Sequence, residues 1–292
     1  MPNLVSGIGS VHHAFQSNDS CQLSHPAGGR NSAGTSTTGK TLDLCGLRPT
    51  FTEDFNDLKV SAWKILGDSR WIAHTPWAGD FGDAAFTDPK PDFPFTVKDG
   101  VLRIEARKEA NGKWRSGLLA SADAWNGGFA QMYGYFEARI KLPKGPGTWP
   151  AFWFSESWPR GSPPGVTVEI DLLEYYGKFP GGFHSVVHLW GANHPGSDHI
   201  KLVPTGSLED DFHTYGFEVE KDFMTFYFDR NQFWQVPTPE EHKHPFMILV
   251  NLALGSGWPI DETPNPSFMD VDYVHAYERD PAASLKEHSD KQ

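Results

Sequence analysis

Residues 135–142 read Tyr-Phe-Glu-Ala-Arg-Ile-Lys-Leu, and this stretch decides the class of fold. Apolar and charged side chains alternate along it, so that one face holds Phe136, Ala138, Ile140 and Leu142 and the other holds Glu137, Arg139 and Lys141. A period of two is the repeat of a β-strand with one face on a core, whereas a surface helix repeats every ~3.6 residues. The stretch therefore predicts a half-buried β-strand.

The same kind of pattern recurs on both sides of this strand. Residues 223–228 alternate, Asp229-Arg230-Asn231 is a turn signal, and the strand pattern resumes at Phe233-Trp234, which together predict a β-hairpin. Further strands are expected at 101–106, 166–175, 185–190, 215–219, 246–254 and 271–277. No long helical period and no internal repeat interrupts them. We therefore predict an all-β fold, a single large β-sandwich of about 230 residues.

The composition supports one large domain and argues against several functions. Of the 292 residues 38% are hydrophobic, and 21 Phe, 11 Trp and 8 Tyr supply a large core. A net charge of −12 without a basic run argues against nucleic-acid binding, and no apolar run approaches the roughly 20 residues of a membrane span. We expect a monomer with a flexible Gly/Ser/Thr-rich segment at 1–47, the β-domain at 48–280 and a polar tail at 281–292.

The N-terminal segment carries motifs whose context is incomplete. It begins with neither the basic region nor the apolar region of a secretory signal peptide. Cys21 and Cys45 could form a disulfide, but a single pair says little about the compartment. Residues 34–41 match the P-loop pattern but lack a strand before it and a helix after it, so nucleotide binding is not expected. We expect deletion of residues 1–46 to leave activity near wild type.

The 13 histidines do not form a metal-binding motif. His184 and His188 are four residues apart, but the valines between them favour a strand, in which the two Cα atoms lie about 13 Å apart. Shared metal ligation by this pair is therefore not expected. The polar stretch 242–244 (His-Lys-His) precedes a proline and is expected to form an exposed turn.

The stretch 168–174 (Val-Glu-Ile-Asp-Leu-Leu-Glu) places three carboxylates in an otherwise apolar strand. Buried acidic groups are costly unless they line a cleft. Glu169 and Asp171 share a face, and a one-residue bulge near 172–173 brings Glu174 back to that face. Side chains that lean inward then leave a gap of about 5 Å between the two glutamate carboxyls, the separation of a retaining glycosidase. Asp171 between them can hold a proton and separate the two pKa values.

Aromatic residues around this strand fit a sugar-binding cleft. Trp149 and Trp153 precede it in the stretch 147–153, and flat aromatic faces stack on the apolar C–H faces of sugars. His188 and Trp190 can face the same cleft from a neighbouring strand. Each tryptophan could equally be a core residue, and His188 could be a hydrogen-bonded core histidine.

Glu169-Ile-Asp171-Leu-Leu-Glu174, with the upstream stretch 149–153, resembles the active-site signature of glycoside hydrolase family 16 in its bulged E-x-D-x-x-E, laminarinase-like form. The resemblance spans about residues 49–279 and includes the stretches 133–143, 211–216, 251–259 and 269–277. It implies a β-jelly roll of two curved antiparallel sheets with an open concave cleft. It also implies that Glu169 is the nucleophile, Glu174 the general acid/base and Asp171 the assisting carboxylate.

The resemblance extends to substrate-binding and metal positions. It implies subsites lined by Trp149, Trp153 and His188, to which we add Trp190, Trp77 from the long loop 71–95, and Trp258. That loop departs from the commonest family pattern, so we expect it to set specificity. No cofactor is required for catalysis, but many members carry a structural calcium, for which the matching positions are Asp54, Gly100 and Asp272.

These residues indicate a retaining endo-β-glycanase acting on a β-1,3 or mixed β-1,3/1,4 glucan or a glucan-like exopolysaccharide. An extracellular location is expected from such a substrate. One alternative is an agarase- or carrageenase-type galactanase, although the negative charge disfavours a sulfated polymer. The others are transglycosylation by the same residues and a non-catalytic carbohydrate-binding jelly roll, which has no need of three crowded carboxylates.

Overall fold

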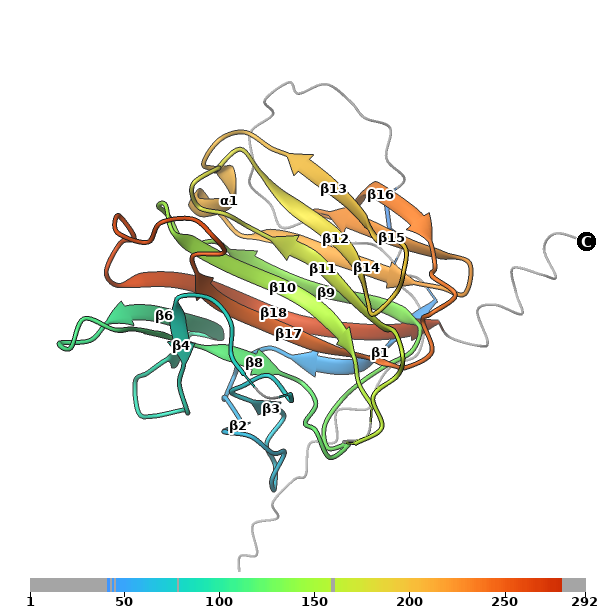
Figure 1. Cartoon of the computed structure of the whole chain (residues 1–292), viewed down its shortest axis with the longest axis horizontal. Helices are drawn as coiled ribbons and strands as arrows, with labels where there is room; N and C mark the ends of the chain where they lie inside the picture. Colours follow the sequence, from blue (N-terminus) through green and yellow to red (C-terminus); the bar gives the residue numbers. More distant parts are fainter. Residues whose placement is uncertain (1–40, 43, 45, 78, 159–160, 280–292) are drawn as a thin grey trace, which may run out of the picture.

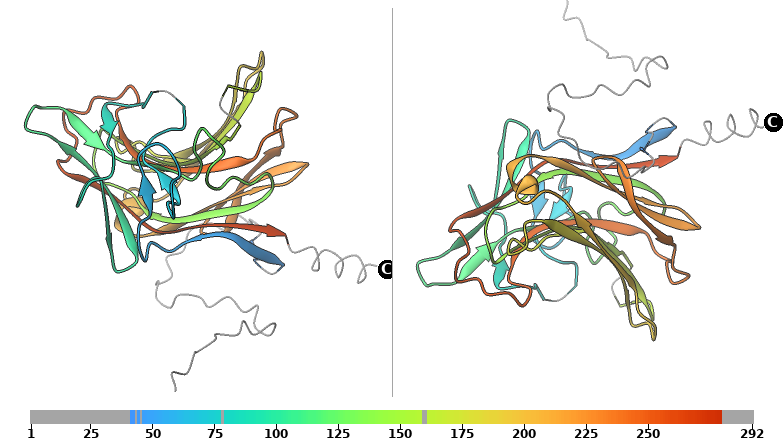
Figure 2. Two further views of the ribbon diagram at one scale, coloured as in Figure 1. Left: turned by 90° about the horizontal axis from the view of Figure 1, so that it is seen from below. Right: turned by 90° about the horizontal axis from the view of Figure 1, so that it is seen from above.

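The computed structural model describes residues 41–279 except 43, 45, 78 and 159–160, and it places them in two β-sheets (Figure 1). One sheet has the order β13 (Ser197–Leu202), β12 (Gly182–Trp190), β11 (Thr167–Glu174), β10 (Thr148–Glu156), β17 (Phe246–Leu254), β8 (Leu118–Ala120), β3 (Trp71–Ile72) and β2 (Val60–Ser61). Its neighbours are antiparallel apart from β2 and β3. Its free face is concave (Figure 2).

The second sheet contains ten strands. Its order is β16 (Asn231–Pro237), β15 (Phe223–Phe228), β14 (His213–Val219), β9 (Gly134–Lys141), β18 (Ser267–Arg279), β6 (Val101–Lys108), β7 (Trp114–Ser116) and β4 (Ala84–Phe86), while β1 (Leu47–Glu53) pairs with β18 and β5 (Phe95–Lys98) with β6. Within the described ranges the one helix is the short α1 (Ser207–Asp210). The predicted all-β sandwich is confirmed. No helix of the described part is long and apolar enough to cross a membrane.

Every strand expected from the sequence is present, and the predicted hairpin is β15–β16. The central strand β10 was not predicted as a strand. It does not alternate, because one face packs on the core and the other forms the floor of a cleft, so eight of its nine residues are buried. Sequence alternation detects half-buried strands and misses a strand that is covered on both sides.

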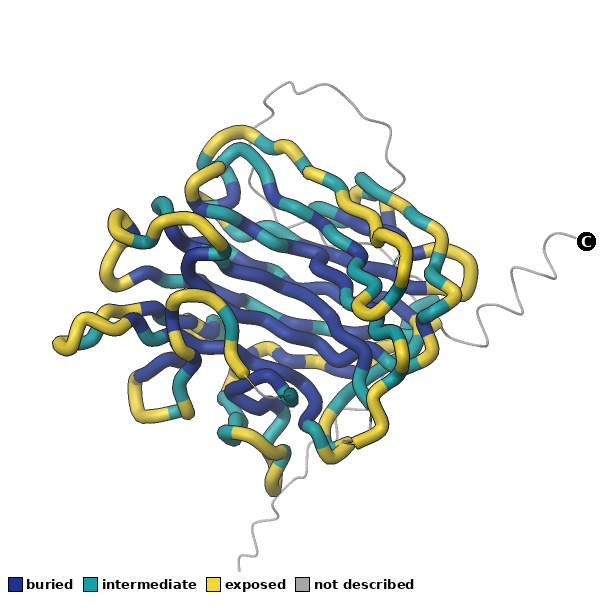
Figure 3. The backbone as a smooth tube through the Cα atoms, viewed as in Figure 1, coloured by how far each residue is buried: buried dark blue, intermediate teal, exposed yellow. Residues whose placement is uncertain are grey.

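Aromatic side chains join the two sheets. Phe154 on β10 lies with its ring centroid 5.1 Å from that of Phe136 on β9 and 5.2 Å from that of Phe217 on β14. All three rings are fully buried, and the strands that carry them form the buried centre of the molecule (Figure 3). Truncating one such ring to alanine costs about 3 to 5 kcal/mol. This packing makes β10 and its neighbours a rigid base for the cleft.

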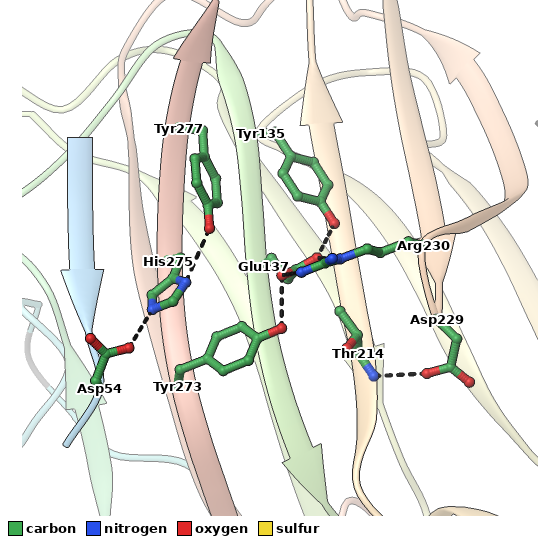
Figure 4. Close-up of polar contacts among 9 residues, drawn as sticks. All are labelled: Asp54, Tyr135, Glu137, Thr214, Asp229, Arg230, Tyr273, His275 and Tyr277. Carbon is green, nitrogen blue, oxygen red and sulfur yellow. Dashed lines mark hydrogen bonds and ion pairs between the residues drawn. The ribbon is translucent and has the colours of Figure 1, made fainter. Parts of the chain in front are cut away.

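The charged face of residues 135–142 is not simply solvated. Glu137 is fully buried and accepts hydrogen bonds from the hydroxyls of Tyr135 at 2.7 Å and Tyr273 at 2.8 Å. The guanidinium of Arg230 donates two further bonds of 2.8 Å to the same carboxylate (Figure 4). A buried charge is tolerated when it is paired and fully hydrogen-bonded, which is the case here. Strand alternation does not reveal such a partner 93 residues away.

Two expectations about local structure are wrong. His242 was expected in an exposed turn but is buried, with its Nδ1 atom 3.2 Å from Glu156 Oε1 and its ring stacked on Phe246. The end of the N-terminal segment was expected to contribute little to the core, but Leu42 is buried against Tyr135 and Tyr227. The P-loop-like stretch lies outside the described residues apart from Thr41, as do both cysteines.

Candidate active site

The three carboxylates are brought together by a β-bulge. Along β11, Asp171 pairs with Val186 and Glu174 with His184, so three steps on β11 oppose two on β12. The pairing with β10 shifts at the same place and leaves Leu172 as the extra residue. The bulge turns Glu174 to the face that holds Glu169 and Asp171, and all three line one cleft. The predicted bulge is confirmed.

The cleft has a volume of about 570 Å³, which is in the usual range for a ligand site. Besides the carboxylates it is lined by Trp77, Phe81, Trp149, Ala151, Trp153, Ser155, Trp158, Thr167, His188 and Trp190. Five of the six residues expected to bind substrate are therefore in its wall. The sixth, Trp258, lies in a separate hollow against Phe179, with ring centroids 5.0 Å apart.

Glu174 is held from one side of its carboxyl group. Trp149 Nε1 donates to Oε1 at 3.0 Å, and the Tyr176 hydroxyl donates to the same oxygen at 2.6 Å. Burial and the charge of Asp171 raise the pKa of Glu174, although both hydrogen bonds oppose the shift. A raised pKa is what a general acid needs in order to keep its proton at working pH.

Glu169 and Asp171 lie beside His188. Burial, and after it the charge of Asp171, raises the pKa of Glu169 to about 8, against a hydrogen bond from Trp190. His188 Nε2 lies 3.1 Å from Asp171 Oδ2, and this contact raises the pKa of His188. The ionisations of the two glutamates and of His188 therefore depend on one another and on the neighbouring charge of Asp171.

Comparison with known proteins gives the family. Residues 92–275 match the family model described as Glycosyl hydrolases family 16. The chain belongs to this family. It is 32% identical over 268 residues to an endo-1,3-1,4-beta-glycanase of Rhizobium meliloti, covering 82% of this chain and 53% of that protein. It is 28% identical over 270 residues to a glucan endo-1,3-beta-glucosidase of Niallia circulans, covering 80% and 38%.

A solved family structure agrees with the fold described above. The endo-beta-1,3-glucanase from Pyrococcus furiosus is 27% identical and has a TM-score of 0.62, covering 80% of this chain and 94% of that chain. The chain spans about half the length of the Rhizobium relative and less of the Niallia one. The predicted family resemblance and the jelly-roll fold are confirmed.

Three residues near the carboxylates of the cleft were missed by the sequence reasoning. Phe81 contacts Trp149 and Trp153 edge-on, at centroid distances of 5.4 and 5.8 Å. Tyr176 bonds Glu174, and Trp158 lies in the cleft wall. Tyr176 could have been found, because it follows Glu174 by two residues. Trp158 lies beyond the end of β10, where no periodic signal shows which way a side chain points.

The segment 71–95 is not one long loop as expected, because it contains β3 and β4, and the loop between these two strands, 73–83, reaches the cleft. Trp77 and Phe81 from this loop reach the cleft wall, in the position expected of specificity residues. Gly82 makes the approach possible, since it has a φ of +76° and a Cβ atom there would lie 2.7 Å from the carbonyl oxygen of Leu254. A side chain at this position would push the loop away from β17.

The residues expected to bind calcium are largely engaged elsewhere. His275 Nε2 lies 2.7 Å from Asp54 Oδ1, and Arg139 donates to Asp272 at 2.7 Å. Gly100 does lie near Asp54, because a Cβ atom on it would be 3.6 Å from the Asp54 carbonyl oxygen. The carboxylates of Asp54 and Asp272 are thus already hydrogen-bonded to His275 and Arg139 within the protein. The family calcium stays a prediction for this chain.

Across the described ranges, one group of three metal-type ligands lies within 4.8 Å, namely Glu169, Asp171 and His188. All three line the cleft described above.

Proposed function

We propose that this chain is a retaining endo-β-glycanase that hydrolyses β-1,3 or mixed β-1,3/1,4 linkages of a glucan or a glucan-like exopolysaccharide. The bulged strand carries the proposal, because it places Glu169 and Glu174 in the wall of one cleft. The relatives support it by name, since one is an endo-1,3-1,4-beta-glycanase and another a glucan endo-1,3-beta-glucosidase. The open, aromatic-lined cleft suits a long neutral chain.

In the reactive form the two glutamates hold one proton between them, and it is on Glu174, which in the first step gives it to the glycosidic oxygen while ionised Glu169 attacks the anomeric carbon. The bond to the leaving sugar breaks, and a covalent glycosyl–enzyme ester forms. In the second step ionised Glu174 takes a proton from water, which displaces Glu169 and restores both groups. Asp171 holds the positive charge of His188 beside the nucleophile and separates the ionisation of the two glutamates.

The galactanase alternative differs in the polymer, and transglycosylation differs in the acceptor of the second step. A purely binding protein is disfavoured by the two raised glutamate pKa values, because crowded buried carboxylates are costly and serve catalysis. Because the proposed substrate is a polymer, the proposal includes an extracellular site of action. It also includes a monomeric enzyme.

The first experiment sizes the products formed from laminarin, mixed-linkage glucan, agarose and carrageenan. We expect short oligosaccharides from the two glucans and none from the galactans. Products from agarose alone would replace the glucanase proposal with the galactanase one, and products longer than the substrate would indicate transglycosylation.

The second experiment assigns the two glutamates with an activated aryl glycoside. Glu169→Ala should abolish hydrolysis, and azide should restore turnover with inverted configuration at the anomeric carbon, because it enters the space left by the nucleophile. Glu174→Ala with azide should give a product of retained configuration, which makes it the matched control. The opposite pair of configurations would exchange the two roles.

A further inference from the structure

A second hollow, of about 610 Å³, adjoins the catalytic cleft. It is lined by Trp63, Pro76, Trp77, Asp123, Ala124, Trp125, Glu156, Ser157, Trp158, Gly161, Pro163 and Met247. Trp77 and Trp158 line both spaces, so the hollow continues the cleft beyond these two rings. It is built where β10 ends and β17 begins, together with the loops that follow β2 and β8. No carboxylate of the catalytic group lies in its wall.

Two tryptophans in this wall are unusually exposed. Trp63 and Trp125 have 49% and 48% of their surface exposed, whereas most large apolar side chains of this protein are buried. Trp63 is also stacked on His74, with centroids 3.9 Å apart and an interplanar angle of 1°. Since the imidazole covers one face of the indole, the exposed surface includes the opposite face. A flat face of this kind is what the C–H side of a sugar ring stacks on.

The imidazole of His74, on which the Trp63 ring is stacked, is fixed in place. His74 is buried, its Nδ1 atom lies 3.3 Å from Asp80 Oδ1, and its Nε2 atom lies 2.8 Å from Asp88 Oδ1. The imidazole can therefore not turn without losing a carboxylate contact. This pre-organisation reduces the entropy that a ligand stacked on Trp63 would otherwise lose on binding.

The part of the wall that carries Trp125 is also held in place, by hydrogen bonds to Asp123. Asp123 accepts hydrogen bonds from the backbone N–H groups of Trp125 at 2.7 Å, Gly127 at 2.9 Å and Ile65 at 2.7 Å. The last of these bonds ties the loop that carries Trp63 to the loop that carries Trp125. The two rings are thus held on one framework.

The acidic side chains of the hollow are engaged within the protein, and Lys64 Nζ lies 5.5 Å from the centroid of the Trp125 ring in its wall. The two acidic residues of the hollow are Asp123 and Glu156, and the carboxylate of Glu156 accepts backbone N–H bonds from Val168, Lys243 and His244. Both carboxylates are therefore used in holding the walls. The other large side chains that line the hollow are mostly tryptophans, and such a surface suits a neutral sugar rather than a charged group.

We propose that this hollow is a distal subsite that binds further sugar units of the same neutral glucan chain whose scissile bond lies between Glu169 and Glu174. Trp63 and Trp125 are its sugar-stacking residues, and His74 is a positioning residue for Trp63. The proposal rests on the proposed function, and continuity through Trp77 and Trp158 is the reason for choosing the glucan chain as occupant. The enzyme then recognises a longer stretch of polymer than its catalytic cleft alone can hold.

The kinetic test compares Trp63→Ala and Trp125→Ala with the wild type on long laminarin and on a short aryl glycoside. We expect KM for the polymer to rise about tenfold in each variant, and the constants for the short substrate to stay unchanged. Trp63→Phe keeps a flat ring and should recover most of the loss. The control is Phe223→Ala, which removes an aromatic ring that is 47% exposed on β15, outside both spaces.

The binding test uses the Glu169→Gln protein and calorimetry with β-1,3-gluco-oligosaccharides of increasing length. Affinity should keep rising with length in this background, and adding Trp63→Ala should end the rise at a shorter oligosaccharide. Unchanged polymer KM in both alanine variants, together with an unchanged length dependence, would overturn the distal subsite. A wild-type protein that cleaves no β-glucan would instead overturn the proposed function, and its binding curves would still report on the hollow.

Discussion

His188 Nε2 lies 3.1 Å from Asp171 Oδ2, across the paired strands β11 and β12. The contact raises the pKa of His188 and so favours the imidazolium form beside Asp171. Asp171 in turn raises the pKa values of Glu169 and Glu174 by its charge. Asp171 therefore raises the pKa values of Glu169, Glu174 and His188.

Replacing Asp171 by asparagine should move the pH profile of kcat/KM to lower pH. Removal of the negative charge lowers the pKa values of Glu169 and Glu174, so both limbs of the bell shift toward acid. We expect kcat to fall by at least about a hundredfold, because charge beside the reacting groups is lost. The fold should persist, since asparagine preserves the shape. A profile that overlays wild type in height and position would show that Asp171 merely fills the strand.

Tyr176→Phe should shift the basic limb in the opposite direction. The Tyr176 hydroxyl donates to Glu174 Oε1 at 2.6 Å and favours the ionised carboxylate. Without this bond the pKa of Glu174 rises, so the acid form survives to higher pH and the basic limb of kcat/KM moves upward. The acid limb, which reports Glu169, should move much less. A basic limb that moves down or stays fixed would contradict the assignment of Glu174 as the acid.

The raised pKa of Glu169 also predicts a pH-dependent stability. Burial raises the pKa of Glu169 in the folded protein to about 8, whereas a glutamate in the unfolded chain has its ordinary pKa of about 4.5. The contribution of this group to stability is therefore present below pH 4.5 and is lost as pH rises through 8. Glu169→Gln should raise the free energy of unfolding by about 2 kcal/mol at pH 8.5 and change it little at pH 4.

Denaturant unfolding at the two pH values measures this difference. The matched control is Glu240→Gln, because Glu240 is exposed and the same substitution there removes a charge without relieving burial. A gain at pH 8.5 that is equal in both variants would mean that net charge, rather than burial in the cleft, is responsible.

The catalytic strand was predictable because its chemistry restricts its geometry. Three carboxylates in an apolar strand are tolerated when they share a cleft, and Glu174 reaches the face of Glu169 only through a bulge, which the register of β11 shows. His188 followed from its place on a neighbouring strand, and Trp149 from its position in the stretch 147–153 that precedes the acidic strand. Local sequence was sufficient here because the decisive spacing lies within six residues.

The parts that could not be predicted depend on partners far along the chain. Glu156 contacts His242, 86 residues away in the sequence, and Glu137 contacts Arg230, 93 residues away. The burial of each carboxylate could not be predicted without knowing its partner. Trp63 and Trp125 come from separate loops that Asp123 ties together. The sequence of a loop has no hydrophobic period that shows where its side chains point. The second hollow could therefore not be predicted and is found only in the folded chain.

Leu42, five residues before the start of β1 at Leu47, also carries a stability prediction. Leu42 is 7% exposed, it packs in a cluster with Tyr135 and Tyr227, and its backbone N–H donates to the carbonyl of Arg230 at 2.9 Å. Leu42→Ala should lower the free energy of unfolding by about 2 kcal/mol, at the low end of buried leucine truncations because the cluster is small. The hydrogen bond remains in this variant, since only the side chain is changed.

Chemical denaturation and glucanase assays on the same protein test this prediction. Activity at 25 °C should stay near wild type, because Tyr135 and Tyr227 belong to the ten-stranded sheet and the catalytic carboxylates to the other. Leu202→Ala is the control, since Leu202 is 75% exposed and its truncation should change stability by less than about 0.5 kcal/mol. Equal stability of the Leu42 variant and wild type would restore the view that the segment before β1 adds nothing to the core. A loss near 2 kcal/mol would instead place the start of the folded domain at or before Leu42, several residues earlier than the sequence alone predicted.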